Sequence, residues 1–329
     1  KGEKIDCVVG HPLIQPHINA VAMTYDMAFD PEFSDLCTTT SHLTGEKINR
    51  FTHIHQSTDD LIKKVKMLRA ISQRTGSCYQ RCVGFDALNA TYSVTYEIDQ
   101  AHGTNYHERF KKFLEYIQKE DLMMSGSMTD PKGDRGLTPG QQPDPDMFVH
   151  VVEKREDGIV INGCKFHMTG IANAFEMLIM PTTGLKPEDA DYAVCCAVPV
   201  DAEGITHIFG RQTNDGRKFD KMDQGNTEFG VVGGECMTIL DHVFVPWDRV
   251  FMCGETEFAG LLVERFASYH RQNYGGCKGG LADIIVGAVT DPTLEDEIMI
   301  TVIASGFDNS VNASAGHRAS TSVLSRNNP

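Results

Sequence analysis

The change of hydrophobic period along the chain is the feature that most constrains its fold. In the first third, apolar residues recur at helical spacing, whereas from about residue 147 short β-rich runs are separated by turn sequences. Helical spacing returns at about Phe258. The sequence therefore predicts an α+β protein with a helical domain at 1–125, a β domain at 126–250 and the start of a truncated second helical domain at 251–288.

Three helices are predicted in the first third. The first follows an N-cap sequence that begins at Ser57, and it ends at Gly76. Its apolar face consists of Leu61, Ile62, Val65, Leu68 and Ile71. The second runs from about Cys78 to Glu97. The third is marked by Phe110, Phe113, Leu114 and Ile117.

The middle of the chain is predicted to be β-structure. From Pro131 to Pro145 it is rich in Gly, Pro and Asp, which predicts a long loop. Asp157-Gly158 and Asn162-Gly163 then stand between β-rich runs and predict two hairpin turns. The predicted strands are 147–153, 158–161, 164–168, 193–200, 206–209 and 238–245. The order helical, β, helical is similar to the layout of acyl-CoA dehydrogenase-like flavoproteins, although the pattern alone is not specific.

The charge balance excludes some classes of partner. The chain has 45 acidic and 30 basic residues, a net charge of −15. Nucleic acids and anionic membranes are bound by clustered Lys and Arg, so neither is expected, while a local basic pocket for a phosphorylated ligand is compatible with this charge. There is no apolar run of about 18 residues, and the N-terminus lacks both a signal peptide and an initiator Met. We therefore expect a cytosolic chain that is clipped at its start.

Four side chains form a candidate metal site. The chain has ten cysteines, and in the cytosol some of these are expected to serve metal binding or catalysis rather than disulfides. Cys78 and Cys82 are four residues apart and would share one face of a helix, as would His270 and Cys277, which are seven apart. Three sulfurs and one nitrogen suit zinc or an iron–sulfur cluster. The alternative is that the cysteines and the histidine are ordinary core residues.

Five segments, which occur in this order, carry a family resemblance. They are Cys78–Gly84 (CYQRCVG), Gly103–Glu108 (GTNYHE), Met128–Arg135 (MTDPKGDR), His167–Gly170 (HMTG) and Tyr269–Lys278 (YHRQNYGGCK). Together they resemble the 4-hydroxybutyryl-CoA dehydratase family, and the similarity extends to about Gly287. The wider superfamily also contains flavin-dependent 4-hydroxyphenylacetate monooxygenases, which share the fold and the flavin site but hold no cluster.

This resemblance implies an activity and two cofactors. Cys78, Cys82, Cys277 and His270 would hold a four-iron four-sulfur cluster, and FAD would be the second cofactor. The implied reaction is radical dehydration of 4-hydroxybutyryl-CoA to crotonyl-CoA with isomerisation of vinylacetyl-CoA, in anaerobic 4-aminobutyrate fermentation by a homotetramer. A C3 hydrogen has no adjacent carbonyl, so one-electron oxidation by the flavin would be needed to acidify it, with the cluster acting as a Lewis acid on the C4 hydroxyl.

The resemblance also assigns catalytic residues. His270 would act as a base at C2, and Tyr274 and Lys278 follow it at intervals of one helical turn, where they would transfer protons or polarise the carbonyl. Glu235 matches an active-site glutamate of the family. The alternatives are a surface pair on a helix for Tyr274 and Lys278, less expected beside a break at Gly275-Gly276, and a solvated loop carboxylate for Glu235.

Two segments resemble the flavin-contacting parts of the family. Thr129 and Thr169 would hydrogen-bond the edge of the flavin ring, and Lys132 or Arg135 would meet phosphate charge. Asp134 and Arg135 would otherwise pair only with each other. The full set of predicted flavin contacts is Met128, Thr129, Lys132, Asp134, Arg135, His167 and Thr169.

The end of the chain departs from the dehydratase pattern. Residues 289–308 resemble the last strand region of the bacterial tubulin-like cell-division GTPase, and they include a β-rich run at Ile298–Ala304. Residues 309–329 are rich in Ser, Asn and Ala and are expected to be disordered. A flavin monooxygenase of the same fold and a fragment without enzymatic activity therefore stand beside the dehydratase as functional hypotheses.

Overall fold

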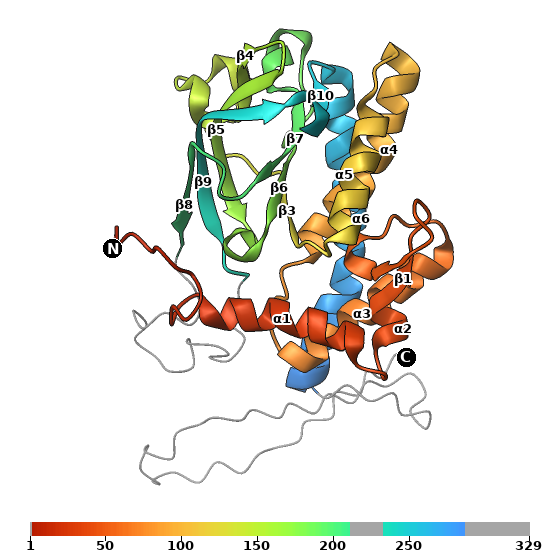
Figure 1. Cartoon of the computed structure of the whole chain (residues 1–329). Coiled ribbons are helices and arrows are strands. Elements are labelled where there is room, and N and C mark those ends of the chain that lie inside the picture. Colours follow the sequence, from red (N-terminus) through yellow and green to blue (C-terminus); the bar gives the residue numbers. More distant parts are fainter. Residues whose placement is uncertain (1, 211–232, 287–329) are drawn as a thin grey trace, which may run out of the picture.

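The computed structural model describes residues 2–210 and 233–286, in which helices and sheets are mixed as predicted (Figure 1). The helices of these ranges are α1 (Gln15–Phe29), α2 (Ser34–Cys37), α3 (Thr58–Thr75), α4 (Cys82–His102), α5 (Tyr106–Lys119) and α6 (Thr256–Val286). The strands are β1 (Thr38–Thr40), β2 (Lys47–Asn49), β3 (Met124–Ser127), β4 (His150–Lys154), β5 (Gly158–Met168), β6 (Glu176–Ile179), β7 (Val194–Pro199), β8 (Ile205–Phe209), β9 (Cys236–Pro246) and β10 (Val250–Cys253). The expectations for 289–329 lie outside the described residues.

Helix α3 begins and ends where its sequence predicts. The Ser57 hydroxyl accepts a hydrogen bond from Asp60 N at 3.3 Å, and the Asp60 carboxyl accepts one from Ser57 N at 3.1 Å, so a capping box starts the helix. Gly76 ends it in the left-handed conformation, with φ of 59°. Helix α5 confirms the third predicted helix. The β1–β2 hairpin in the same part of the chain has no signal in the sequence pattern.

Two four-stranded sheets form the β part of the molecule. Their strand orders are β10-β7-β6-β3 and β4-β5-β9-β8, with β3 and β6 parallel and all other neighbours antiparallel. Strands β7, β8 and β9 confirm the three predicted strands after residue 190. One apolar core joins both sheets to the helices beside them, including Leu88 of α4, Phe110 of α5 and Val245 of β9 (Figure 1).

The predicted hairpin turn at Asn162-Gly163 is wrong. Strand β5 continues through this pair, and β9 follows it on both sides of a bulge between Ile161 and Gly163. Gly163 has φ of 136°, and a Cβ there would lie 2.6 Å from the carbonyl oxygen of Phe148, so the bulge requires glycine. Asn-Gly supplies the backbone conformations of a tight turn and of a bulge alike. The hairpin at Asp157-Gly158, between β4 and β5, is confirmed.

Helix α4 begins four residues later than predicted. Cys82 is its first residue, so Cys78 lies in the irregular segment before it, and the two cysteines do not share a helix face. Gln80 prevents α4 from starting earlier, because it adopts a left-handed conformation with φ of 68°. Its side chain fixes this turn, since Nε2 donates to His17 O at 2.8 Å and Oε1 accepts from Asn173 Nδ2 at 2.6 Å.

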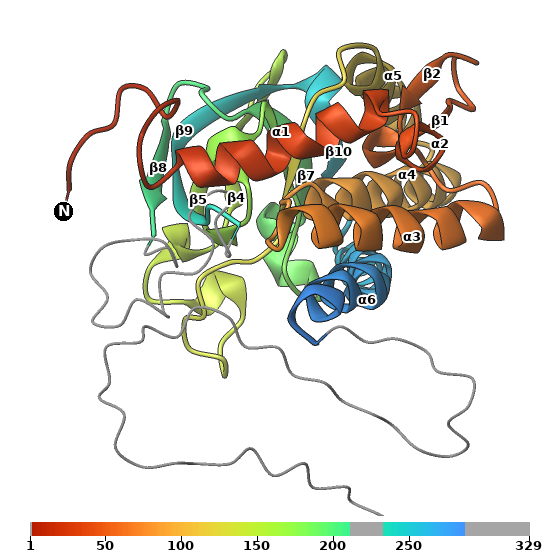
Figure 2. The ribbon, with the colours of Figure 1, turned by 90° about the horizontal axis from the view of Figure 1, so that it is seen from below.

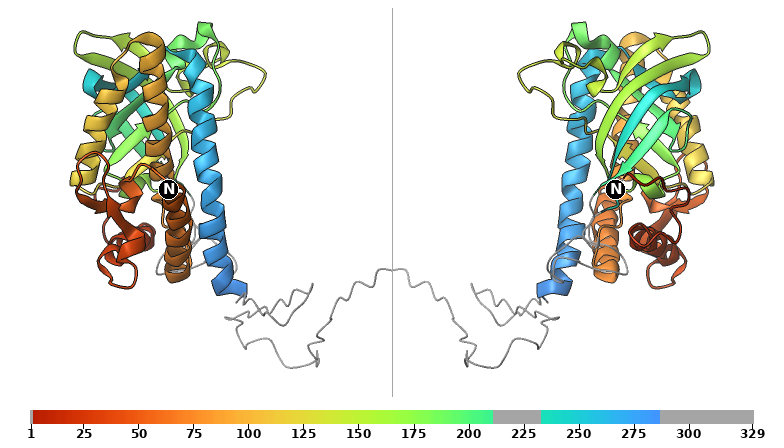
Figure 3. Two further views of the ribbon diagram at one scale, coloured as in Figure 1. Left: turned by 90° about the vertical axis from the view of Figure 1, so that its right-hand side faces the viewer. Right: turned by 90° about the vertical axis from the view of Figure 1, so that its left-hand side faces the viewer.

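Helix α6 is one continuous helix that runs along the molecule beside α3 and α4 (Figure 3). A Cβ at Gly276 would lie 2.6 Å from Val65 O, and one at Gly280 would collide with Arg69 O. The expected break at Gly275-Gly276 is therefore wrong, because Gly276 serves close packing on α3. None of the helices in the described ranges combines the length and apolar character that crossing a membrane requires.

Helix α1 crosses the end of the molecule below the sheets and reaches α2 and α3 (Figure 2). Its His17 ring lies edge-on to Phe209 of β8, with the ring centroids 6.1 Å apart. Through the hydrogen bond from Gln80 to His17 O, α1 also supports the segment that carries Cys78. Helix α1 thus links the β4-β5-β9-β8 sheet to the segment that precedes α4.

Candidate functional site

Three of the four predicted cluster ligands are cysteines that gather where the start of α4 meets α6. Burial raises the pKa of the Cys78 thiol to about 11, with Cys277 adding to the rise and Lys278 opposing it. Burial and then Cys78 raise the pKa of Cys82 well above the ordinary value, and Cys277 also contributes. Each thiol therefore lies within electrostatic reach of the others, although about 200 residues separate Cys82 from Cys277.

Tyr79 lies among these three thiols. Burial, followed by Cys82, Cys277 and Cys78, raises the pKa of its hydroxyl well above the usual value. The hydroxyl approaches Cys277, but no described residue gives it a well-aligned hydrogen bond. Buried hydroxyls normally have a partner. A buried donor ringed by thiols fits a group that carries sulfide acceptors, as an iron–sulfur cluster does.

A single metal ion fits this arrangement less well than a cluster. Among the described residues, no three His, Cys, Asp or Glu side chains lie close enough together to bind one ion. Zinc ligands stand roughly 4 Å from one another, as follows from zinc–sulfur bonds of about 2.3 Å. This argues against the zinc alternative, whereas ligands of a four-iron cluster attach to different irons and lie further apart.

His270, the fourth predicted ligand, is held from α4. Its Nδ1 lies 2.9 Å from Asp86 Oδ2, and Asp86 follows Cys82 by one turn of the same helix. The His270 ring stacks on Phe266, with centroids 5.6 Å apart and an interplanar angle of 11°. The side chain is 24% exposed, whereas that of Asp86 is fully buried. His270 is therefore an oriented, partly exposed side chain rather than a core histidine.

Tyr274 and Lys278 lie on α6 at the spacing that the sequence predicts. The Tyr274 ring meets the His270 ring edge-on, with centroids 5.6 Å apart, and is 50% exposed. Lys278 is exposed, and its charge lowers the pKa values of Cys78 and Cys277 against the larger effect of burial. Lys278 thus lies beside the thiols, and both side chains are open to the solvent side of α6.

Glu235 meets two residues that were predicted to contact the flavin. Thr169 Oγ1 donates to Glu235 Oε1 at 3.2 Å, and His167 Nδ1 lies 3.6 Å from Glu235 Oε2. The backbone holds this pairing, because Gly170 N donates to Gly233 O at 2.7 Å. A Cβ at Gly233 would lie 2.5 Å from Thr169 Cγ2 and 3.1 Å from Cys78 Sγ, so glycine lets the segment close over both. Glu235 is therefore not an isolated loop carboxylate.

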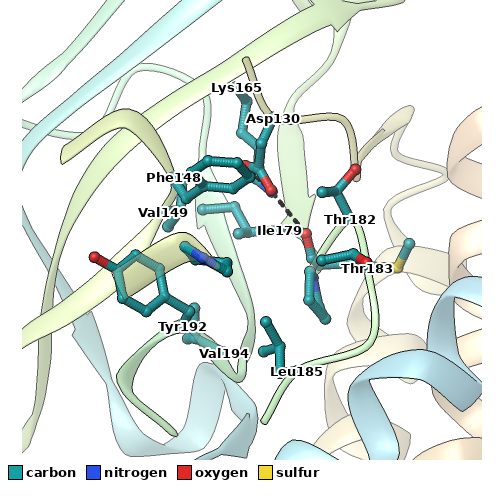
Figure 4. A pocket seen from close by; sticks show the side chains of 13 residues that line it. Asp130, Phe148, Val149, Lys165, Ile179, Thr182, Thr183, Leu185, Tyr192 and Val194 are labelled. Atoms are coloured by element: carbon teal, nitrogen blue, oxygen red, sulfur yellow. Dashed lines mark hydrogen bonds and ion pairs between the residues drawn. The ribbon is translucent and has the colours of Figure 1, made fainter. Parts of the chain in front are cut away.

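The two predicted flavin segments lie side by side because β5 supports both of them. Phe166 N donates to Thr129 O at 2.8 Å, and the buried Lys165 donates to Met128 O at 2.9 Å. Lys165 also pairs with Asp130 at 2.6 Å. This pair borders a small hollow of about 10 Å³ between Phe148, Tyr192, Leu185 and the Thr182–Thr183 segment (Figure 4).

The charged members of the flavin set are exposed. Lys132, Asp134 and Arg135 all have exposed side chains. Asp134 accepts a hydrogen bond from Gly136 N at 2.8 Å, and in the described part of the chain it forms no ion pair with Arg135. The alternative that Asp134 and Arg135 pair only with each other is therefore wrong.

Three polar residues behind His270 are not predicted from the sequence: Lys64, Asp86 and Asn273. All three are fully buried. Lys64 interrupts the apolar face of α3, at helical spacing from Leu61, Leu68 and Ile71. Asp86 interrupts the apolar run that follows Cys82. A charged residue within an apolar helix face was the available signal, because buried charges need partners.

Comparison with known proteins shows which family the chain belongs to. Residues 1–252 match the family model described as 4-hydroxyphenylacetate 3-hydroxylase N terminal. The chain belongs to the 4-hydroxyphenylacetate 3-hydroxylase family. Within this setting it is 57% identical, over 290 residues, to 4-hydroxybutyryl-CoA dehydratase/vinylacetyl-CoA-Δ-isomerase of Clostridium aminobutyricum, a match that covers 87% of this chain and 59% of that protein.

Solved structures agree with the family. An oxygen-tolerant 4-hydroxybutyryl-CoA dehydratase from N. maritimus superposes with a TM-score of 0.82 at 49% identity, covering 87% of this chain and 57% of that chain. The oxygenase component of 4-hydroxyphenylacetate 3-monooxygenase, complexed with FAD, gives 0.70 at 24% identity over 87% of this chain and 59% of that one. The resemblance to 4-hydroxybutyryl-CoA dehydratases is thus confirmed, and the chain spans a little under three fifths of the length of these two relatives.

Proposed function

We propose that this chain is part of a 4-hydroxybutyryl-CoA dehydratase with vinylacetyl-CoA Δ-isomerase activity, which uses FAD and a four-iron four-sulfur cluster. The observation that supports the proposal is that Cys78, Cys82 and Cys277 come together where the start of α4 meets α6, the helix that also carries His270, in a chain 57% identical to a protein of that name. Because the chain spans only part of its relatives, the acyl-CoA substrate, the homotetramer and the cytosolic location belong to the proposal as well.

The proposed ligands are the three thiols and Nε2 of His270. Metal binding must displace the thiol protons. Burial opposes this displacement, because it raises the pKa values of Cys78 and Cys82 and so favours the protonated thiols. The positive charge of Lys278 assists the displacement at Cys78 and Cys277, because it stabilises thiolate. When bound, the cluster supplies a Lewis acid for the C4 hydroxyl and the flavin exchanges one electron with the substrate.

The chain's own side chains provide the proton chemistry. His270 is assigned to the proton at C2 when its Nε2 is not bound to iron, because Asp86 holds the other ring nitrogen and fixes the ring. Tyr274 and Lys278 lie on the same side of α6 as His270 and are assigned to the thioester carbonyl. Glu235, held by Thr169, provides a carboxyl group where the flavin segments approach Cys78.

Turnover by the anaerobically purified chain tests this function. We expect 4-hydroxybutyryl-CoA and vinylacetyl-CoA both to be converted to crotonyl-CoA, as followed by chromatography of the thioesters. Glu235→Gln should lower kcat by 10² to 10⁴-fold, which is the usual contribution of a positioned acid or base. Cys164→Ser, which changes a half-buried thiol of β5, should keep the wild-type rate. Oxygen-dependent hydroxylation of 4-hydroxyphenylacetate by an iron-free chain would contradict the proposal and favour the monooxygenase.

A further inference from the structure

A network of buried polar side chains joins three helices behind His270. Lys64 of α3 and Asp86 of α4 are both fully buried, and Lys64 Nζ lies 2.7 Å from Asp86 Oδ1. The other carboxyl oxygen, Oδ2, accepts from Asn273 Nδ2 at 2.6 Å and from His270 Nδ1 at 2.9 Å. Asn273 and His270 both belong to α6. The carboxyl group of Asp86 is therefore the point at which α3, α4 and α6 meet.

Lys64 is committed to this network and is not a free cation. Besides Asp86, its ammonium donates to Tyr269 O at 3.0 Å and lies over the rings of Phe85 and Tyr269, 5.3 and 5.5 Å from their centroids. A buried ion pair commonly contributes little net stability, because both charges lose their hydration. Apolar side chains of similar volume would hold three helices together at least as well. The network is thus poorly explained by stability alone.

The network determines which nitrogen of His270 carries the proton. An ionised carboxyl group only accepts, so the contact with Asp86 Oδ2 requires the proton to be on Nδ1. Asn273 Nδ2 also approaches Nδ1, but at 3.4 Å, and its shorter bond is the one to Asp86. With Nδ1 protonated, Nε2 keeps its lone pair and is free to bind metal. Stacking on Phe266 fixes the plane of the ring.

We propose that Asp86 is a positioning residue that presents His270 Nε2 to the cluster, with Lys64 and Asn273 holding the carboxyl group in place. This inference rests on the proposed function. Histidine ligands of metals commonly donate their second ring N–H to a carboxylate, which fixes the tautomer and the ring orientation. Because Cys82 and Asp86 lie one turn apart on α4, one helix carries both a ligand and the group that aims another ligand.

A second buried pair supplies a matched control. Lys165 and Asp130 are 1% and 4% exposed and lie 2.6 Å apart, but Asp130 contacts no histidine among the described residues. Asp86→Asn and Asp130→Asn therefore remove the same charge from similar surroundings. Both should lower the thermal unfolding temperature. Only the first should change the nitrogen ligand of the cluster.

The first measurement is pulsed EPR and iron analysis of the reduced, anaerobically prepared chain. In the wild type and in Asp130→Asn we expect hyperfine coupling to a directly bound nitrogen. In Asp86→Asn that coupling should be lost or shifted. The affinity for iron, measured by competition with a chelator, should be about 10 to 100-fold lower. A folded Asp86→Asn protein with wild-type coupling and iron retention would overturn the inference.

The second measurement uses only the wild-type chain, so it shows which ring nitrogen of His270 binds the cluster even if Asp86→Asn fails to fold. Wild-type chain is produced with histidine labelled with ¹⁵N at one ring nitrogen only. The strong coupling should come from the label at Nε2, while the label at Nδ1 should show a weak, remote coupling. Binding through Nδ1 would overturn the role of Asp86 and leave the dehydratase proposal standing. A wild-type chain that holds no iron would overturn both.

Discussion

Among single residues, His55 is the one whose chemistry most directly links the fold to pH. Its ring packs against Phe85 and Tyr269, with centroids 4.9 and 5.7 Å away. Neither ring nitrogen has a hydrogen-bond partner among the described residues. Burial, followed by the charge of Lys64, lowers the pKa of His55 to about 3. Between about pH 3 and pH 6.5, this imidazole is therefore neutral in the folded chain and protonated in the unfolded chain.

His55→Phe is expected to make the fold less sensitive to acid. An exposed histidine titrates near pH 6.5, so below that pH the unfolded chain binds a proton that the folded chain excludes until about pH 3. The contribution of His55 to stability is therefore intact above 6.5 and is lost as the pH falls. When the pH falls from 7 to 5, the free energy of unfolding of the wild type, measured by urea unfolding, should fall by up to about 2 kcal/mol relative to that of the variant. Parallel curves for the two proteins would contradict this.

At the residue scale, the proposed ligands can be predicted from the sequence, but the side chains that support them cannot. Cys78, Cys82, His270 and Cys277 stand out through their chemistry and spacing, and a family resemblance assigns all four to a cluster. Asp86 and Lys64 carry no motif, and only the packing of three helices shows that they meet. The position of Tyr79 among the three thiols is likewise visible only in the structure. From the sequence alone, an aromatic residue between two cysteines could lie in many environments.

At the scale of elements, the contact between α3 and α6 depends on which glycines of α6 face it. A Cβ on Gly276 would lie 2.6 Å from Val65 O and 2.9 Å from Leu68 Cβ, whereas one on Gly275 would have no heavy atom within 4 Å. The two glycines are adjacent, yet only one of them is required by packing. This contact also sets the position of Cys277, the next residue of the helix.

Alanine at these two positions should therefore act in opposite directions. Gly275→Ala should stabilise the fold by up to about 1 kcal/mol, because alanine has the higher helix propensity. Gly276→Ala should destabilise it by about 1 to 3 kcal/mol, because the new methyl group forces α3 and α6 apart. Urea unfolding followed by circular dichroism measures both. Equal effects of the two substitutions would show that α6 does not pack on α3 through Gly276.

Elements with local signals are predictable, and those fixed by distant contacts are not. The capping box at Ser57 and the left-handed Gly76 define α3 from its sequence alone. The start of α4 escapes prediction because Gln80 holds a left-handed turn through bonds to His17 and Asn173, which are remote in sequence. The Asn162-Gly163 bulge is missed because the same dipeptide also forms hairpin turns.

At the scale of the whole molecule, the candidate site is assembled from four separate parts of the chain. The segment before α4, the end of β5, the Gly233–Glu235 segment and α6 meet around Cys78. Hydrophobic periodicity predicts the helical, β, helical order but cannot bring such remote parts together. The family resemblance supplied the grouping of residues, and the structure supplies the contacts among Cys78, Thr169 and Glu235.

The iron and acid-labile sulfide content of the anaerobically purified chain is the decisive test of the proposed cluster. We expect about four irons and four sulfides per wild-type chain, as in a four-iron four-sulfur cluster. At least half of this iron should be lost in Cys82→Ser and none in Cys164→Ser, whose partly buried thiol on β5 is not a proposed ligand. A wild-type chain with less than about one iron, or three proteins with equal iron, would contradict the proposed cluster.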